Sequence, residues 1–431
     1  MRASAEQEHE ARVPVVGTPK SATGRERETF ESDESGRTVA DVALYLPRNV
    51  LDLLFITTGA ASGLIEDEQV VPRLKDTFYS ENHEIGVFPT AFVETGFTPN
   101  IGARMIASID NFASTLRAGY GGPDSTVVES RIRMTSGCRI PLSLSIEWLQ
   151  DRRTDLVFMG LGPSPEQDPR NQFRPLQLSR NGLYRERRQR MIAGVGVRLA
   201  PDWVLVLSNG LKSRHVDDAP DAGSDQLSRV FEPSSIPGAN RITRTVYTEA
   251  ALRFDSRENR GAPTTGAMME AYGGVYNGIR SQGASAVASG VRWAAFLPLY
   301  RVTNVISPRI TIDSITPLGD APLPFFDYLS AADFRGFDGR RDRVVMVASV
   351  DYRWTLIQYI AARVFGDATN VAPEVSSLAL EHARYAWGLG FDLHSASTQI
   401  GRVAASFSQG DMRLFLSLGV APSGFGDRQH R

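Results

Sequence analysis

"RYAWGLGFDLH", residues 384–394, carries the pattern that decides the fold. Every second residue from Tyr385 to Leu393 is large and apolar, and the residues between them are small, polar or charged. Successive side chains of a β-strand point to opposite faces, so this alternation predicts a strand with two unlike faces. The same period occurs in "LSLSIEW" (142–148), in "MRLFLSLGV" (412–420) and near 101–109, 125–134, 193–199, 246–255, 286–297, 344–354 and 399–407.

Two architectures fit this pattern. A soluble sandwich or propeller has an apolar core face and a polar solvent face, whereas an outer-membrane barrel has an apolar lipid face and a polar lumen. The predicted strands run about 9–12 residues, which is the length that a tilted strand needs to cross a bilayer. Their polar faces carry Gly, Ser, Ala and paired charges, and tryptophans lie near strand ends or on the apolar face (Trp148, Trp203, Trp293, Trp354 and Trp387). We therefore predict an all-β fold, a transmembrane antiparallel β-barrel.

The composition excludes several classes of protein. The chain has 431 residues, of which 42% are hydrophobic, and a net charge of −2, which is too balanced for a nucleic-acid binder. Its single cysteine, Cys138, excludes an internal disulfide. No run of 18 apolar residues predicts a transmembrane helix. The first residues lack the apolar core of a secretory signal, so we expect the native precursor to carry a signal peptide upstream.

Counting back from the C-terminus gives about 16 strands. The gaps between them alternate between short and long, as periplasmic turns and outer loops do in such barrels, and residues 162–182, 215–242 and 313–341 form the long ones. The count is even only if residues 84–95 are a lead-in to the first strand at 99–109. It also needs separate strands at 140–150 and 153–161, joined by a tight turn at 151–152.

The N-terminal region lacks the alternating pattern of the barrel strands. Residues 1–40 are polar and predict a disordered tail. Residues 41–83 predict a short periplasmic helical segment, which Pro47 opens in its first turn. Packing helices are the simpler reading of this segment, and a membrane-surface anchor is the alternative. The barrel then spans 84–431, with a loop at 313–341 that folds into its lumen.

Five motifs, in order along the chain, resemble the bacterial surface antigen family of BamA and TamA barrels. "FRGF" (334–337) resembles the Arg-Gly-aromatic motif of the sixth extracellular loop, and "VDYRW" (350–354) and "VFGDATN" (364–370) resemble the two strands after it. "RFDSRENRGAPTTG" (253–266) resembles the Asp-x-Arg turn, and "FMGLGPS" (158–164) resembles the segment before the third outer loop. The resemblance implies an outer-membrane assembly or translocation barrel over most of 84–431.

Two features depart from the family. "SAAD" (330–333) replaces the usual glycine pair before the Arg-Gly motif. The sequence ahead of the barrel is too short for a POTRA repeat together with the two helices. POTRA repeats receive client proteins in the well-studied members of the family.

The motif around Arg335 predicts the functional site. Alternation places Asp351 on the lumen face, where a loop arginine reaching into the barrel would make bidentate, charge-assisted contacts. The resemblance adds Asp367 as a second partner on the inner wall. Asp367 is two residues after Phe365, so in a regular strand the two side chains share a face, and we expect Phe365 on the lipid face. For Asp367 to lie on the inner wall, the strand must therefore have a bulge or an end near Gly366. Gly336 lets the loop turn sharply, while Phe334 and Phe337 wedge it against the wall. An ordinary surface loop is the alternative.

Two classes of function remain. The first is an assembly or translocation barrel in the outer membrane, with its N-terminus in the periplasm, which opens a weak seam between its first and last strands. The second is a passive pore or structural barrel with a plug loop, and a soluble all-β binding protein is a distant third. We predict no enzymatic activity, because His394 faces the lumen and His382 lacks a serine partner. We expect no cofactor, no metal and no nucleic acid, and as partners the bilayer and periplasmic partner or client proteins.

Overall fold

The computed structural model describes residues 78–80, 82, 84–94, 100–136, 141–175, 180–258, 262–279, 283–299, 303–357, 359–394, 399–409 and 411–418. The predicted tail at 1–40 lies outside the described residues, as does almost all of the helical segment predicted at 41–83. All structural statements below concern the described residues.

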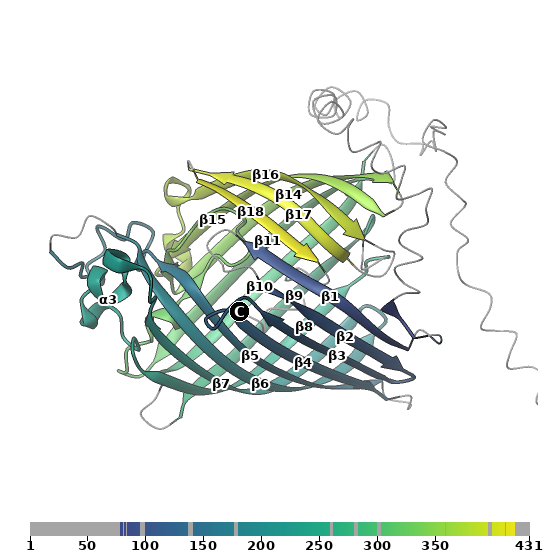
Figure 1. Cartoon of the computed structure of the whole chain (residues 1–431), viewed down its shortest axis with the longest axis horizontal. Coiled ribbons are helices and arrows are strands. Elements are labelled where there is room, and N and C mark those ends of the chain that lie inside the picture. The colour runs from purple at the N-terminus through teal and green to yellow at the C-terminus, as the bar shows by residue number, and fades with distance from the viewer. Residues whose placement is uncertain are drawn as a thin grey trace, which may run out of the picture.

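Within that part of the chain, 16 strands close into an antiparallel barrel (Figure 1). Neighbours in sequence are neighbours in the barrel, and β1 closes the ring against β18. The predicted all-β antiparallel barrel is therefore confirmed. The strands are β1 (Ile85–Glu94), β2 (Asn100–Ile109), β3 (Phe112–Tyr120), β4 (Thr126–Thr135), β5 (Leu142–Phe158), β6 (Gly182–Ala200), β7 (Trp203–Asp218), β8 (Ile242–Asp255), β9 (Gly266–Gly278), β10 (Ser285–Pro298), β11 (Asn304–Leu318), β14 (Val344–Ile357), β15 (Ile360–Ala372), β16 (Arg384–His394), β17 (Gln399–Ser408) and β18 (Asp411–Leu418).

Two strand assignments from the sequence are wrong. Residues 84–95 are not a lead-in, because they form β1, which pairs with both β2 and β18. Residues 140–150 and 153–161 are not two strands, because β5 runs through both without a turn. Asp155 takes a positive φ of 58°, and the register with β6 shifts between Arg153 and Leu156. This bulge bends the strand where a turn had been predicted, and the two errors cancel in the strand count.

The two faces of the barrel wall are inverted relative to a soluble protein. Large apolar side chains point outward into the surroundings, among them Trp387 and Tyr385 on β16, which are 60% and 56% exposed. The opposite face carries buried charged groups, such as Arg188 on β6, Arg292 on β10 and Asp392 on β16. An apolar exterior around a polar interior is what a bilayer-embedded barrel requires.

The connections differ between the two ends of the barrel. One end has the tight turns at 110–111 and 201–202, and the other has the long loops 159–181, 219–241, 319–343 and 373–383. Short helices occur on these loops, including α3 (Leu227–Val230), which lies beyond the ends of β5–β7 in Figure 1. Within the part of the chain that the structure describes, no helix is long and apolar enough to span a bilayer.

Three of the long loops, 159–181, 219–241 and 319–343, pack together into a cap over their end of the barrel. Its apolar core joins Phe158 at the end of β5, Phe231 after α3 and Phe325 in loop 319–343. The rings of Phe231 and Phe325 lie 5.0 and 4.8 Å from that of Phe158, centroid to centroid. The cap is therefore a small hydrophobic core in its own right, and it covers the mouth from which loop 319–343 enters the lumen.

Candidate functional site

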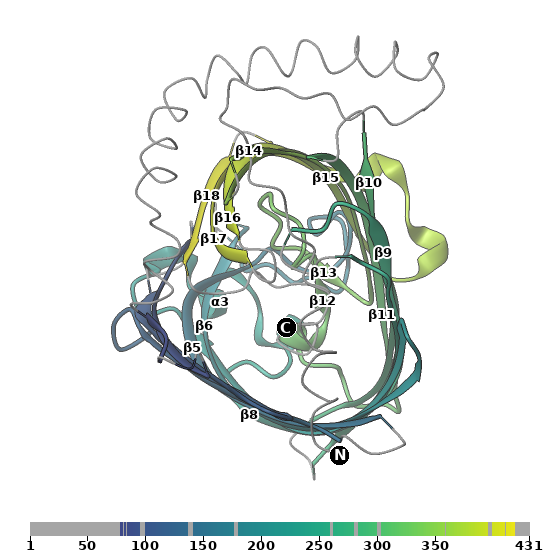
Figure 2. The ribbon, with the colours of Figure 1, turned by 90° about the vertical axis from the view of Figure 1, so that its right-hand side faces the viewer.

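Loop 319–343 connects β11 to β14 and runs inside the barrel. It contains η3 (Phe325–Asp327) and a two-stranded sheet of β12 (Leu329–Ser330) and β13 (Arg341–Asp342). Figure 2 shows β12 and β13 within the ring of strands. The loop begins at 319 rather than 313 because β11 continues to Leu318, where Leu318 pairs with Ser285 of β10.

Arg335 lies at the tip of this loop, between two carboxylates of the inner wall. Its Nε donates to Asp367 Oδ2 at 2.8 Å, and its backbone N–H donates to the same oxygen at 3.0 Å. Its Nη1 and Nη2 donate to Asp351 Oδ1 and Oδ2 at 2.5 and 3.3 Å, and Nη2 also donates to Asp367. The planar guanidinium thus joins β14 to β15 through both of its edges, which an ammonium group could not do.

Phe365 forms the floor beneath the guanidinium. Its ring centroid lies 3.7 Å from Arg335 Cζ, which is a close cation–π contact. The bulge expected near Gly366 is absent, because β14 and β15 pair in continuous register from Val344–Ala372 to Thr355–Ala361. Phe365 shares the face of Asp367, as its parity requires, and that face is the lumen rather than the lipid. The expectation that Phe365 faces lipid was wrong.

Gly388 on β16 makes room for the Phe365 ring. A Cβ atom at Gly388 would lie 2.4 Å from Cζ of Phe365 and 2.3 Å from the carbonyl oxygen of Ala405. The inward-facing glycine of "WGLGF" therefore belongs to the site, although the sequence pattern marked it only as a small residue on the lumen face. Arg335, Phe365 and Gly388 form a stack of three layers from the loop to the wall.

The residues on either side of Arg335 pack as tightly. Phe334 is 4% exposed and packs in an apolar cluster with Val345, Val347 and Val371 of the inner wall. A Cβ atom at Gly336 would lie 2.5 Å from the Phe334 ring and 2.8 Å from Ala386, so only glycine fits there. The backbone N–H of Phe337, whose side chain is half-buried, donates to Ser408 Oγ at 3.2 Å. The structure thus brings together all six residues singled out from the sequence.

The last two strands of the barrel also bind the loop tip. Ser406 Oγ of β17 donates to the carbonyl oxygen of Arg335 at 2.5 Å. Arg413 Nη1 of β18 donates to the carbonyl oxygen of Gly336 at 2.6 Å. The tip is therefore a bridge from β14 and β15 to the strands that close the ring. Sequence reasoning missed these contacts, because they use the loop backbone as acceptor and leave no motif.

A row of alternating charges continues from the site along the inner wall. Arg363 Nη1 donates to Asp351 at 3.1 Å, and Arg363 Nε donates to Asp392 at 2.9 Å. Arg402 Nε donates to Asp392 at 2.7 Å. With Arg335 and Asp367, the row holds three arginines and three aspartates, so its formal charge is zero. Mutual neutralisation of this kind is what makes buried charges tolerable.

The chain after the tip is fastened to the cap. Arg170 Nη1 and Nη2 each donate to one oxygen of Asp342 at 2.9 Å, and the Asp342 side chain is completely buried. Arg340, which is 2% exposed, donates to Asp338 and to the carbonyl oxygen of Pro163 at 2.8 Å. The backbone adds a pair of bonds, from Gly162 N to Arg341 O at 2.9 Å and from Arg341 N to Gly160 O at 3.1 Å.

One carboxylate of the cap has a shifted pKa. Burial alone would raise the pKa of Asp168, but its hydrogen bonds and charge contact with Arg170 outweigh burial and hold that pKa below its usual value. The shortest of these bonds joins Arg170 Nη2 to Asp168 Oδ2 at 2.6 Å. Arg170 thus binds two carboxylates, Asp168 and Asp342, in the same way that Arg335 binds Asp351 and Asp367.

The described residues contain no group of three or more His, Cys, Asp or Glu side chains that could hold a metal ion. The charged groups of the site pair with one another. Their arrangement positions a loop and joins strands.

No family model and no curated protein matches the sequence. Among solved structures, BamA from Haemophilus ducreyi lacking POTRA domains 1–3 is similar, with a TM-score of 0.54 and 11% identity over 78% of this chain and 70% of that one. CdiB from Acinetobacter baumannii has a TM-score of 0.47 and 12% identity over 78% of this chain and 59% of that one. The first likeness shows that this chain adopts the fold of a BamA barrel.

Proposed function

We propose that this protein is an outer-membrane barrel of the BamA and TamA type, which inserts or translocates proteins or other substrates at that membrane. The observation that supports this proposal is the bridge made by loop 319–343. Its tip fills part of the lumen and joins β14 and β15 to β17 and β18. An occupied lumen favours a route through the wall, and the bridge ends at the strands where a wall opening would form.

The pairing of β1 with β18 supports such an opening. Among the described residues, Ala91–Glu94 pairs with Phe415–Leu418. This seam joins the first and last strands of the barrel, so no turn of the chain links the two strands directly and the ring can part there without straining a turn. A parted seam exposes strand edges that an incoming strand could pair with.

The proposed setting follows from the two ends of the barrel. Outer-membrane barrels have short turns on the periplasmic side and long loops outside. The start of β1 lies at the short-turn end, which supports a periplasmic position for the N-terminal side of the barrel. Lipid would cover the apolar outer face, and clients or periplasmic partner proteins would approach the short-turn end. This mechanism needs no catalytic group, cofactor or nucleic acid.

A reversible lock on the seam tests the proposal. Ala91 and Leu418 are paired across the seam, so Ala91→Cys with Leu418→Cys, in a Cys138→Ser background, would form a disulfide there. Val275→Cys with Val287→Cys, on the paired strands β9 and β10, is the matched control away from the seam. The assay uses phosphatidylcholine vesicles that contain the barrel and receive a urea-unfolded outer-membrane β-barrel. Folding of the added barrel is followed by heat-modifiable gel mobility.

We expect the protein to accelerate folding of the added barrel several-fold. The oxidised seam lock should abolish the acceleration, reduction should restore it, and the control disulfide should leave it unchanged. No acceleration, or acceleration that survives the seam lock, would contradict the proposal. A large, steady conductance of the unmodified barrel in a planar bilayer would instead favour the passive pore with a plug loop.

A further inference from the structure

Loop 373–383 folds back onto the outer wall of the barrel instead of extending β16. β16 begins at Arg384, and the residues before it form η4 (Val375–Ser377) and η5 (Leu380–His382). Figure 2 shows these yellow-green coils outside the ring of strands, and Figure 1 places them at the same end of the barrel as α3. The loop touches the chain after the lumen tip at one point, where Arg340 Nη1 donates to the carbonyl oxygen of His382 at 3.1 Å.

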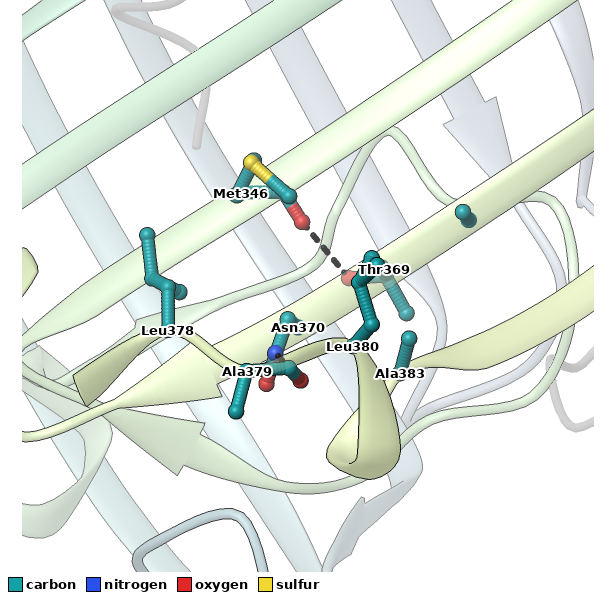
Figure 3. A pocket seen from close by; sticks show the side chains of 8 residues that line it. Met346, Thr369, Asn370, Leu378, Ala379, Leu380 and Ala383 are labelled. Carbon is teal, nitrogen blue, oxygen red and sulfur yellow. Dashed lines mark hydrogen bonds between the residues drawn. The ribbon is translucent and has the colours of Figure 1, made fainter.

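A small cavity of about 80 Å³ lies between this loop and strands β14 and β15 (Figure 3). Met346, Ala368, Leu378, Leu380 and Ala383 provide most of its lining, which is almost entirely apolar. Met346 and Ala368 belong to the outward-facing sets of β14 and β15, because their sequence neighbours Val345, Val347 and Asp367 face the lumen. The cavity therefore opens on the side of the wall that faces lipid.

Asn370 contributes one polar group to this apolar cavity. Its side chain is almost fully buried at 2% exposure, and Nδ2 donates to the carbonyl oxygen of Ala379 at 2.6 Å. That bond identifies the other amide atom as the oxygen, because two facing oxygens would repel each other. The oxygen, Oδ1, is buried and accepts no hydrogen bond. A buried acceptor without a partner costs about 1–3 kcal/mol, so the site favours a ligand that brings a donor.

The surface around the cavity continues the apolar exterior of the barrel. Leu380 and Val375 project from the loop with 79% and 58% of their surface exposed. Glu374 and Glu381 are exposed beside them. Apolar side chains interleaved with carboxylates suit the boundary between hydrocarbon and head groups, where one side of the loop is apolar and the other wet.

We propose that this cavity binds the acyl chain of a membrane lipid that carries a hydrogen-bond donor, an amide N–H or a hydroxyl, near its polar end. The apolar lining takes a segment of the chain, and Asn370 Oδ1 accepts the hydrogen bond. Such a lipid combines an apolar body with a donor at the depth where the cavity lies. The inference rests on the proposed membrane placement of the barrel, but not on its assembly role.

Photo-crosslinking with a matched pair of lipids tests the proposal. The probes are the N-methyl amide and the N,N-dimethyl amide of one diazirine-bearing fatty acid, which differ only in the amide N–H, in phosphatidylcholine vesicles that contain the full-length barrel. Mass spectrometry compares labelling at residues 373–383 with labelling on the outer face of β3. The variants are Asn370→Ala, Ala383→Phe to fill the cavity, and Ala118→Phe on the outer face of β3 as a bulk-matched control.

We expect the N-methyl amide to label 373–383 several-fold more than the dimethyl amide. Asn370→Ala should remove that preference, Ala383→Phe should abolish labelling at the loop with both probes, and Ala118→Phe should change nothing there. Equal labelling by the two probes, or labelling that survives Ala383→Phe, would overturn the proposal. Labelling of β3 reports membrane insertion separately, so failure of the lipid site is distinguishable from failure of the barrel to reside in the bilayer.

Discussion

The two halves of loop 319–343 are held by opposite kinds of contact. Phe325 and Phe326, early in the loop, are buried in the aromatic core of the cap. Arg335, at the tip, is held by Asp351 and Asp367 in the lumen. Apolar burial is non-directional, so the cap can hold the loop while its rings shift. A forked guanidinium between two carboxylates has one geometry, so the tip either lies in its place or is free.

This difference suggests a division of labour within the loop. The cap keeps the loop at the mouth of the barrel whatever the tip does. The tip can stay bound only while β14, β15, β17 and β18 keep their relative positions, because its hydrogen bonds reach all four strands. The predictions below separate these two roles, from the largest expected effect to the smallest.

Arg335→Ala should have the largest effect, because it leaves two buried carboxylates facing each other without a counter-charge. Removing one partner of a buried pair costs about 3–5 kcal/mol, less where lumen water reaches the site. Arg335→Lys should not restore the lost stability, since an ammonium group cannot make paired hydrogen bonds to both carboxylates at once. Urea unfolding in liposomes measures the free energy, and hydrogen exchange at the backbone N–H groups of residue 335 and Phe337 measures release of the tip.

A double-mutant cycle sharpens that test. Asp351→Asn combined with Arg335→Ala should cost less than the sum of the two single changes, because the residues are coupled. Arg174→Ala, an arginine of the cap whose side chain is 41% exposed, is the control and should have little effect. Additive losses, with no change in hydrogen exchange at the tip, would mean that the tip is not held by this pair.

Leu227→Ala should loosen the cap while leaving the tip in place. Leu227 is 1% exposed on α3, and truncating a buried leucine costs about 2–5 kcal/mol. We expect a value near the lower limit, because loops relax around a cavity more readily than strands do. Protease nicking should increase within 219–241, while hydrogen exchange at the backbone N–H groups of Arg335 and Phe337 should stay unchanged. Release of both regions together would show that the two anchors form one cooperative unit.

Phe365→Leu should weaken the tip anchor by about 1 kcal/mol, because it removes the cation–π contact and keeps an apolar floor. Its matched control is Phe391→Leu, on the outer face of β16. The readout is the urea concentration at which half of the loop tips are released, and trypsin cleavage measures that release. A loss as large as that of Arg335→Ala would mean that the aromatic ring, not the carboxylates, positions the arginine.

Acid should weaken the cap, and this is the smallest of the expected effects. The pKa of Asp168 is lowered by Arg170, so its contribution is complete above the usual carboxyl pKa of about 3.9 and is lost as the pH falls through the lower folded value. The expected size is below about 1 kcal/mol, because Arg170 is about one-third exposed. Pepsin cleavage of the cap between pH 4 and pH 2 measures it. Asp168→Asn should be cleaved equally across that range, and a persistent pH dependence would assign the effect to another carboxylate.

Part of the site was readable from the sequence and part was not. Parity along "VDYRW" predicts that Asp351 faces the lumen, and the contacts of Arg335 agree with it. The same parity, applied backward from Asp367, would have put Phe365 and Arg363 on the inner wall as well. Phe365 was assigned to lipid because it is large and apolar, and that rule fails where an aromatic ring supports a cation. Ser406 and Arg413 had no signal, since they bind backbone atoms of a distant loop.

The strand errors have a similar cause. An even strand count needed residues 84–95 to be a lead-in, but β1 pairs there with both β2 and β18. In β5, "QDRRTD" resembles a turn, but Asp155 absorbs the extra residue as a bulge. Only pairing with neighbours distinguishes a polar bulge from a polar turn.

The sequence by itself determined the wall of the barrel. Alternation has a period of two wherever one face meets lipid and the other a polar lumen, so each strand and its facing can be read locally. The tertiary structure decided what the wall holds. Closure of β1 on β18, the stack of Arg335 on Phe365 over Gly388, and the cavity under loop 373–383 depend on residues far apart in the chain. Such contacts depend on which strands become neighbours and in what register, and local periodicity does not contain that information.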